Sequence, residues 1–363
     1  MQFDIARRPN PRLSEHHHGS DWVISHDLGW TLHSHGGTQV LHKGLAGNWC
    51  SISLEHTGWS IDTPPERSFP LWTNAAQDRV TNCEALGERI HNFNQVSHDG
   101  DSLQRRWQEP HWFGGVKRGL PIMTTQGVVD VVCGELVSQA RSLDAKGLPI
   151  RAAATGGVDS ALVRAALDHA GVAYTIVNKA TSHKSPNHQY VWDNNESAGG
   201  NFWGYNQLAN TEQPHIQATG FWGDEWMQRN PLYVSMYLHQ HGRDITQEFD
   251  SVEGEVYMTR FFNEGYRDKI AKFDPTTEPY QHMLNRMSND FQMWHMDECL
   301  TWTPLHSPVI FESLLRLSPD AVIAQCMEAD FTKRLIRELN PKLLVGLNQH
   351  KNNRRLWPSA MVL

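Results

Sequence analysis

The chain of 363 residues lacks long apolar runs, paired cysteine motifs and dense stretches of lysine and arginine. No window approaches 18 uninterrupted apolar residues, which disfavours a membrane-spanning helix. The five cysteines are scattered without a CxxC pair, which is typical of reduced thiols rather than of a disulfide framework or a structural zinc site. Because 32 basic residues face 40 acidic ones, giving a net charge of −8, we expect neither a nucleic-acid partner nor an anionic membrane.

The N-terminal stretch "MQFDIARRPNPRL" has an acidic residue and prolines where a signal peptide needs an apolar core, so we expect a soluble, cytoplasmic protein. The 21 histidines are spread along the chain, although two short groups stand out in "EHHHGS" and "LHSHGG". These groups contain His16, His17, His18, His33 and His35. They have no defined set of spaced partners, so we interpret them as surface and strand histidines rather than metal ligands.

The first third of the chain has the pattern of an antiparallel β-rich domain. From Asp21 to about Asn74, short runs alternate between apolar and polar residues and are broken by glycine. In "NWCSISLEH", Ile52 and Leu54 lie on one face and Ser51 and Ser53 on the other, the period of two expected of half-buried strands. A helical stretch is predicted near Asn82–Asn92. We place the domain boundary at residue 120, with domains at 1–120 and 121–363.

The second domain has the pattern of an α/β layer structure. Val129, Val132, Leu136, Ala140 and Leu143 recur every three or four residues and predict one apolar helix face. A strand over about 150–154, a helix ending near Gly171 and the strand "VAYTIVN" then predict a strand-helix-strand unit and a parallel sheet. Helical periodicity dominates the remainder, notably in "SPVIFESLLRLS" and "DAVIAQCMEADFTKRLIREL".

The turn between that strand and helix, in "ATGGVDSAL", has the features of a phosphate cradle. A helix N-terminus presents unpaired N–H groups and the positive end of the helix dipole, so an anion binds there readily. Gly156 and Gly157 let a phosphate approach the backbone, while Thr155 and Ser160 add hydroxyl groups and Asp159 can hold Mg²⁺. The string is neither a Walker A loop nor GxGxxG. The alternative is a tight structural turn in which Asp159 or Ser160 caps the helix.

A second glycine-bounded acidic turn follows in "ATGFWGDEWMQRNP", with Gly220, Gly223, Asp224 and Glu225. Magnesium prefers octahedral oxygen ligands, so two acidic turns facing one triphosphate make better chemical sense than either alone. We therefore predict Asp159 and Asp224 as the metal-binding pair.

These motifs, in this order, resemble the ATP pyrophosphatase (PP-loop) superfamily, whose loop reads SGGxDS, and within it asparagine synthetase, β-lactam synthetase and the cyclases of lasso-peptide pathways. Thr155 stands where the family has serine, and Trp222 where the second turn has glycine. The segments "HMDECLTWTPLHSPVIFESLLRLSP" and "LIRELNPKLLVGLNQHKN" extend the likeness, so that it covers about 127–352.

The resemblance implies an adenine nucleotide alpha hydrolase-like domain with a parallel five-stranded sheet, flanking helices, and ATP and Mg²⁺ as cofactors. By position, Lys351 and Glu225 are the candidate catalytic residues, and Asn178 follows the second strand where related folds place adenine. An ordinary polar loop around Asn178 and a solvated surface for Lys351 stay open as alternatives. The passage "GNWCSISLEHTGWSIDTPPERSFPLWTN" resembles a strand-hairpin-strand passage of the family's glutaminase (Ntn-like) domain. We interpret the N-terminal domain as a degenerate version, because Gln2 follows Met1 where family members expose a catalytic cysteine.

We therefore predict an AMP-forming ligase that adenylates a small-molecule carboxylate, releases PPi and transfers the acyl group to an amine without hydrolysing glutamine. Homo-oligomerisation stays open. One alternative is a non-catalytic protein that retains the fold. Another is a different PP-loop enzyme that modifies nucleobases or tRNA, against which the lack of clustered cysteines counts.

Overall fold

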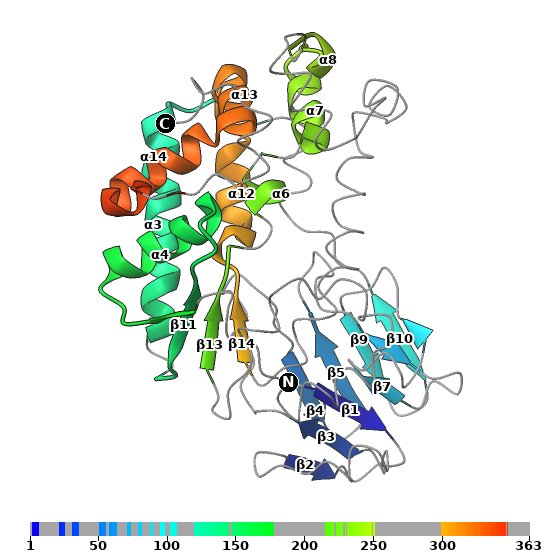
Figure 1. The fold of residues 1–363 in the computed structure, drawn as a ribbon. Helices are drawn as coiled ribbons and strands as arrows, with labels where there is room; N and C mark the ends of the chain where they lie inside the picture. The colour runs from blue at the N-terminus through cyan, green and yellow to red at the C-terminus, as the bar shows by residue number, and fades with distance from the viewer. Residues whose placement is uncertain are drawn as a thin grey trace.

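The computed structural model describes residues 2–6, 22–25, 31–35, 51–55, 58–63, 71–73, 79–81, 88–89, 95–98, 102–106, 120–144, 147–177, 215–220, 223–227, 229, 231–248, 250, 299–345 and 347. Antiparallel strands make up the described part before residue 107, and helices around a parallel sheet make up the rest (Figure 1). Among the described helices, none combines the length and apolar character needed to cross a membrane.

The N-terminal strands form two antiparallel sheets, as the alternating pattern predicts. The first sheet has the strand order β2-β3-β1-β7-β6-β8, with β1 (Gln2–Ala6), β2 (Trp22–Ser25), β3 (Thr31–His35), β6 (Trp72–Thr73), β7 (Arg79–Thr81) and β8 (Glu88–Arg89). The second has the order β10-β9-β5-β4, with β4 (Ser51–Glu55), β5 (Gly58–Asp62), β9 (Gln95–His98) and β10 (Leu103–Arg106).

Strand β5 shows the predicted alternation of burial. Trp59 and Ile61 are buried, while Ser60 between them is partly exposed. Ile61 pairs with Ile52 on one side and with the buried Val96 on the other, so apolar residues share a register position across three strands. Cross-strand apolar pairs of this kind stabilise one face of a sheet against water.

The helix predicted near Asn82–Asn92 is wrong at its centre. Glu88 and Arg89 form strand β8, which pairs antiparallel with Trp72 and Thr73 of β6. Strand pairing satisfies backbone groups through a partner that is distant in sequence, so a local helical pattern does not reveal it.

The second part of the chain contains an all-parallel sheet with the order β12-β11-β13-β14, formed by β11 (Ile150–Ala153), β12 (Thr175–Val177), β13 (His215–Ala218) and β14 (Cys299–Trp302). This agrees with the predicted parallel sheet. In the described part of the chain the sheet has four strands rather than the expected five. The carboxyl ends of β11, β13 and β14 therefore meet at one edge.

The predicted strand-helix-strand unit is present as β11, α4 (Val158–Ala170) and β12. The helix buries Leu162, Ala165 and Ala166. It ends at Gly171, whose φ of 72° is left-handed and whose N–H donates to the Asp168 carbonyl at 3.1 Å. This is the glycine cap that the sequence indicates.

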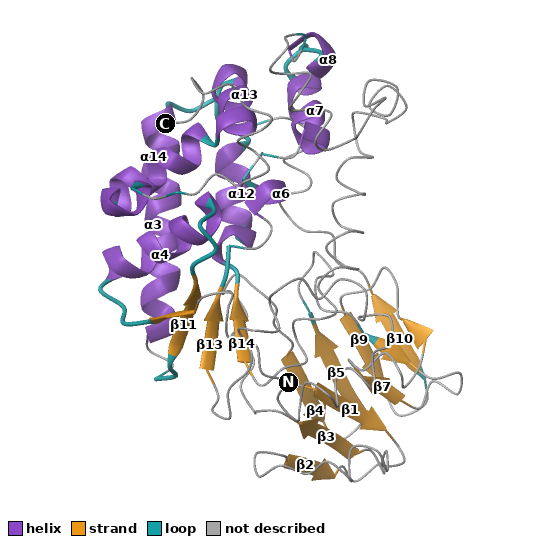
Figure 2. Cartoon of the chain, viewed as in Figure 1, coloured by secondary structure: helices purple, strands orange, loops and turns teal. Residues whose placement is uncertain are grey.

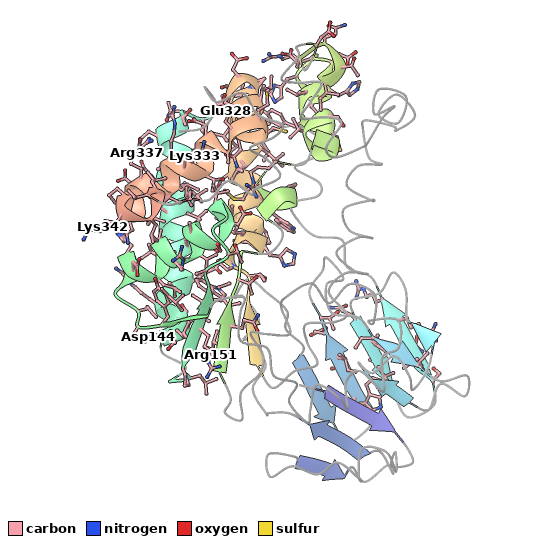
Figure 3. The ribbon with its side chains drawn as sticks, viewed as in Figure 1. Asp144, Arg151, Glu328, Lys333, Arg337 and Lys342 are labelled. Atoms are coloured by element: carbon pink, nitrogen blue, oxygen red, sulfur yellow. The ribbon has the colours of Figure 1, made fainter. Side chains whose placement is uncertain are left out.

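The flanking helices are α3 (Thr125–Asp144), α12 (Pro308–Leu314), α13 (Pro319–Glu328) and α14 (Asp330–Leu339) (Figure 2). The predicted apolar face of α3 is confirmed, because Val129, Val132, Leu136, Ala140 and Leu143 are all buried. Helix α14 packs against both α3 and α4. Charged residues of these helices, such as Asp144, Glu328 and Arg337, are exposed (Figure 3).

A buried polar chain ties α3 to the end of the sheet. Trp302 Nε1 donates to Gln139 Oε1 at 3.1 Å, and Gln139 Nε2 donates to Glu135 Oε1 at 2.5 Å. Ser307 Oγ donates to the same Glu135 oxygen at 2.8 Å. Because unpaired buried polar groups are costly, this chain of contacts fixes α3 relative to β14 and the start of α12.

Candidate functional site

The glycine turn predicted as a phosphate cradle lies at the carboxyl edge of the sheet, between β11 and α4. Gly156 has a φ of 81°, in the left-handed region that glycine adopts without strain. Gly157 is the N-cap of α4 in an extended conformation, and it has no side chain to cap the helix. The first N–H groups of a helix have no intrahelical acceptor, so this turn directs hydrogen-bond donors towards the end of the sheet.

The two hydroxyl side chains of the turn contact each other. Thr155 Oγ1 and Ser160 Oγ lie 2.9 Å apart, and Ser160 Oγ donates to the Gly157 carbonyl at 3.0 Å. The Gly157 N–H in turn donates to Thr155 Oγ1 at 3.3 Å. Thr155 is exposed and Ser160 is buried. The threonine hydroxyl thus shapes the loop, and an entering phosphate would compete with it for the Gly157 N–H.

The second glycine turn packs directly on Asp159. A Cβ atom added to Gly220 would lie 2.5 Å from the Asp159 carbonyl carbon and 2.7 Å from the Ser160 nitrogen. A Cβ atom on Gly223, which begins α6 (Gly223–Trp226), would lie even closer to the Asp159 carboxyl group. Contacts below 3.0 Å do not occur between real Cβ atoms and their neighbours. The two turns therefore meet, as their common chemistry predicts, and glycine at both positions makes the close approach possible.

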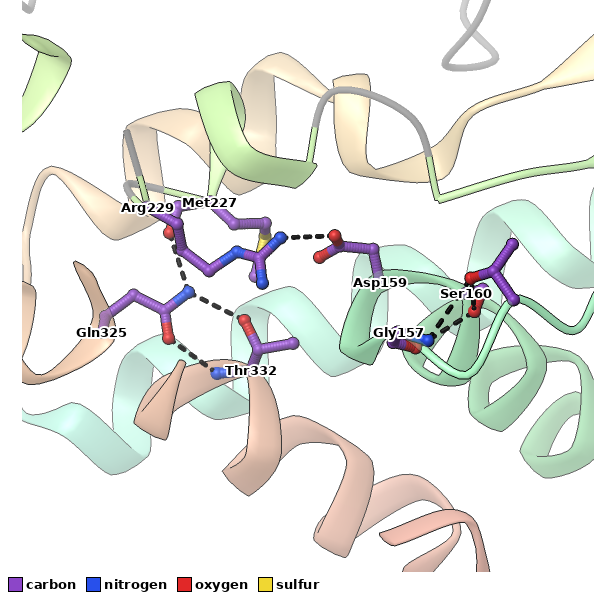
Figure 4. Close-up of polar contacts among 8 residues, drawn as sticks. Gly157, Asp159, Ser160, Met227, Arg229, Gln325 and Thr332 are labelled. Atoms are coloured by element: carbon purple, nitrogen blue, oxygen red, sulfur yellow. Dashed lines mark hydrogen bonds and ion pairs between the residues drawn. The ribbon is translucent and has the colours of Figure 1, made fainter. Parts of the chain in front are cut away.

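The partner of Asp159 is an arginine that sequence reasoning missed. Arg229, in the segment after α6, donates from its terminal nitrogen to Asp159 Oδ2 across 70 residues of sequence (Figure 4). The side chains of Arg229 and Asp159 are 12% and 22% exposed, so this ion pair is largely shielded from water. Its sequence signal is weak, because an arginine that follows an acidic turn has many potential partners.

The segment carrying Arg229 is anchored by helix α13. Gln325 Nε2 donates to the Met227 carbonyl at 2.8 Å and to Thr332 Oγ1 at 2.7 Å, while Thr332 N donates to Gln325 Oε1 at 2.9 Å (Figure 4). Cys326 Sγ lies 3.7 Å from the Arg229 carbonyl oxygen and donates to it. Helices α13 and α14 thus hold the backbone on which the arginine sits.

Behind the second turn lies a buried histidine. His306, in the short 3-10 helix η4 (Pro304–His306), contacts Trp226 of α6 edge to face with ring centroids 4.5 Å apart. Burial lowers the pKa of His306 to about 3. The ring is therefore neutral at pH 7 and serves as an apolar packing partner rather than a charge.

The described residues include only part of the predicted metal site. No group of three or more histidine, cysteine, aspartate or glutamate side chains gathers there to hold a metal ion. Asp224 and Glu225 belong to α6, but their side chains lie outside the described residues, as do Asn178 and Lys351. Asp159 is thus the one predicted metal ligand whose side chain is placed.

Comparison with known proteins adds no family assignment. No protein-family model and no curated protein matches the chain. The chemistry of the site therefore carries the functional argument.

Proposed function

We propose that the chain is an AMP-forming carbon–nitrogen ligase of the asparagine-synthetase-like kind. In this proposal ATP adenylates a carboxylate, PPi leaves, and an amine attacks the acyl-adenylate to form an amide with release of AMP. The observation that carries the proposal is the packing of Gly220 and Gly223 on Asp159, which joins the two turns of the resemblance at one edge of the parallel sheet. Ligands of open α/β sheets bind at this carboxyl edge.

The turn has the chemistry of a pyrophosphate site. Val158, Asp159 and Ser160 begin α4, and the free N–H groups of a first turn attract an anion, helped by the helix dipole. Gly156 and Gly157 keep side chains away from the approaching phosphate. In this role Thr155 and Ser160 exchange their mutual hydrogen bond for bonds to phosphate oxygens.

The donor set at the turn fits Mg²⁺ held jointly by protein and nucleotide. Magnesium in such sites needs one or two carboxylates, with phosphate oxygens and water as the other ligands. Asp159 would be one carboxylate and Asp224 the second. When bound, the ion would neutralise charge on the phosphates and help PPi to leave.

The remaining roles follow the family likeness. Lys351 would neutralise negative charge that develops during adenylation, Glu225 would be a catalytic carboxylate, and Asn178 would line the adenine side of the cleft. The domain over 121–363 would carry the synthetase activity. The domain over 1–120 would be a degenerate Ntn-like domain kept for packing. We further propose a cytoplasmic location and small-molecule substrates.

A non-catalytic protein that retains the fold as a structural component is the second candidate, and two contacts favour it. Thr155 Oγ1 accepts the Gly157 N–H that a phosphate would use, and Asp159 is engaged by Arg229. With these contacts, the Gly157 N–H and the Asp159 carboxylate already have partners within the protein.

Exchange of labelled PPi into ATP, measured with Mg²⁺ across a panel of carboxylates, separates the two candidates. We expect exchange in the wild type and a loss of about a hundredfold or more in Asp159→Asn, because the variant lacks a proposed ligand of the Mg²⁺ that would neutralise the reacting phosphates. Asp144→Asn is the matched control, since Asp144 is an exposed carboxylate at the far end of α3. A folded wild type that gives no exchange with any carboxylate supports the non-catalytic alternative.

A further inference from the structure

The cation beside the phosphate turn belongs to the protein itself. We propose that Arg229 is a positioning residue which neutralises and orients Asp159, so that the turn binds an oligophosphate without a divalent metal. The inference rests on the proposed function in one respect, namely that the ligand of the turn is a pyrophosphate group. It goes beyond that function because it says that Arg229 determines whether phosphate binding at the turn requires a metal ion.

The charge of Asp159 acts against an anion at the turn. Asp159 lies in the first turn of α4, so its carboxylate carries a full negative charge beside the N–H groups that would bind a phosphate. Like charges a few ångströms apart in a partly dehydrated site repel strongly. A cation must therefore accompany Asp159 whenever an anion enters. Arg229 meets this need, because an arginine keeps its charge in proteins.

The ion pair between Arg229 and Asp159 is held from both sides. Gly220 and Gly223 press on the backbone and the carboxyl group of Asp159, which limits rotation of the carboxylate. On the other side, the carbonyl groups of Met227 and Arg229 accept hydrogen bonds from α13. The arginine thus sits on an anchored segment, and its contact with Asp159 is built into the fold rather than formed by a mobile surface side chain.

Asp159 is also the carboxylate proposed to hold Mg²⁺, and the guanidinium of Arg229 is already in place on it. Metal and guanidinium thus act on the same carboxylate. Removal of the arginine should expose Asp159 to the metal and transfer the task of neutralisation to Mg²⁺.

The test is calorimetric titration with inorganic pyrophosphate, in EDTA and again in Mg²⁺, on the full chain. We expect the wild type to bind pyrophosphate in EDTA. In Arg229→Gln the affinity in EDTA should fall about tenfold or more, the size expected for an uncompensated charge, and Mg²⁺ should restore it to within about threefold. The matched control is Arg334→Gln, which removes an arginine from an exposed ion pair on α14 and should change neither titration.

A double variant separates electrostatics from folding. Asp159→Asn/Arg229→Gln removes both charges, so its affinity in EDTA should return to within about threefold of wild type. If Arg229 served only to stabilise the fold, Arg229→Gln would lose affinity equally in both buffers and the double variant would not recover it. Unchanged affinity of Arg229→Gln in EDTA, or no binding by the wild type in EDTA, overturns the proposal as well.

The same titrations distinguish this inference from the proposed function. If pyrophosphate binding follows Arg229 as expected but no carboxylate supports PPi exchange, the ligase assignment fails and the role of Arg229 stands. If exchange is observed but Arg229→Gln behaves as wild type in EDTA, the role of Arg229 fails and the ligase assignment stands.

Discussion

At the scale of single residues, the close approach of two turns depends on the absence of one side chain. Gly220 lies so near the backbone of Asp159 and Ser160 that a methyl group has no space. Backbone atoms cannot move aside as a flexible side chain can, so the strain would spread into the first turn of α4. This makes Gly220 the residue whose substitution reports most directly on the geometry of the candidate site.

We expect Gly220→Ala to destabilise the protein by about 1–3 kcal/mol, the usual cost of overpacking a filled site. The control is Gly134→Ala, because Gly134 lies on the exposed side of α3 with nothing near its Cβ position. That change should stabilise the protein by up to about 1 kcal/mol through helix propensity. Urea denaturation of both variants measures the difference, and equal effects would contradict the packing described for Gly220.

The buried histidine makes stability depend on pH. The pKa of His306 is lowered from 6.5 to about 3 in the folded protein, so between these values the unfolded chain binds a proton that the folded chain does not. Stability is therefore complete above pH 6.5 and falls as the pH drops towards 3, by at most about 1.4 kcal/mol per pH unit. In His306→Gln this contribution should vanish.

Urea denaturation at pH 7 and pH 5 gives the comparison. The stability difference between wild type and His306→Gln should shrink towards pH 5, because the wild type alone loses the contribution of the neutral ring. His239→Gln is the control, since it removes a histidine from an exposed position on α7 (Pro231–Gln240) rather than from the core. A constant difference for His306→Gln would show that the ring is not held neutral.

At the scale of elements, the support of the site comes from the junction of α13 and α14. Helix α13 ends at Glu328. The next residue, Ala329, has a φ of 55° and turns the chain before Asp330 begins α14. The side chain of Gln325 forms hydrogen bonds with Thr332 of α14, and its nitrogen also donates to the Met227 carbonyl. One buried amide therefore connects two helices with the segment that carries Arg229.

We expect Gln325→Leu to cost about 2–3 kcal/mol, because the Thr332 N–H and the Met227 carbonyl lose the partner that satisfies them inside the protein. Glu328→Ala, at an exposed position of the same helix, should stay within about 0.5 kcal/mol of wild type. Chemical denaturation of both variants checks this prediction. If Gln325→Leu proved as stable as Glu328→Ala, the amide would not join the helices as described.

Secondary structure could be predicted where the residues of a single helix, strand or turn are sufficient to specify it. The buried face of α3, the strand-helix unit of β11 and α4, and the cap at Gly171 were all predicted from periodicity and glycine placement. Strand β8 was not, because its pairing with β6 depends on a segment elsewhere in the chain. Short strands obtain their hydrogen bonds from neighbours, so their own residues carry little information.

At the scale of the whole molecule, antiparallel sheets form the N-terminal part and a parallel sheet lies in the C-terminal part. We expect no glutamate release when the protein is incubated with glutamine, with or without Mg·ATP. This expectation rests on the proposal that the domain over 1–120 is a degenerate Ntn-like domain kept for packing. A coupled glutamate assay, calibrated with added glutamate, measures this. Steady glutamate formation would contradict the proposal that the N-terminal domain serves packing.

The sequence by itself determined the α/β character of the second domain, the place of the glycine turn between a strand and a helix, and the candidate residues Thr155 to Ser160. These follow from local patterns, since periodicity and turn chemistry act over a few neighbouring residues. The tertiary structure alone decided that Gly220 and Gly223 lie close to Asp159 and that Arg229 forms an ion pair with it. Asp159 and Arg229 are 70 residues apart, and folding brings them together through the parallel pairing of β11 with β13 and the anchoring of the arginine segment on α13.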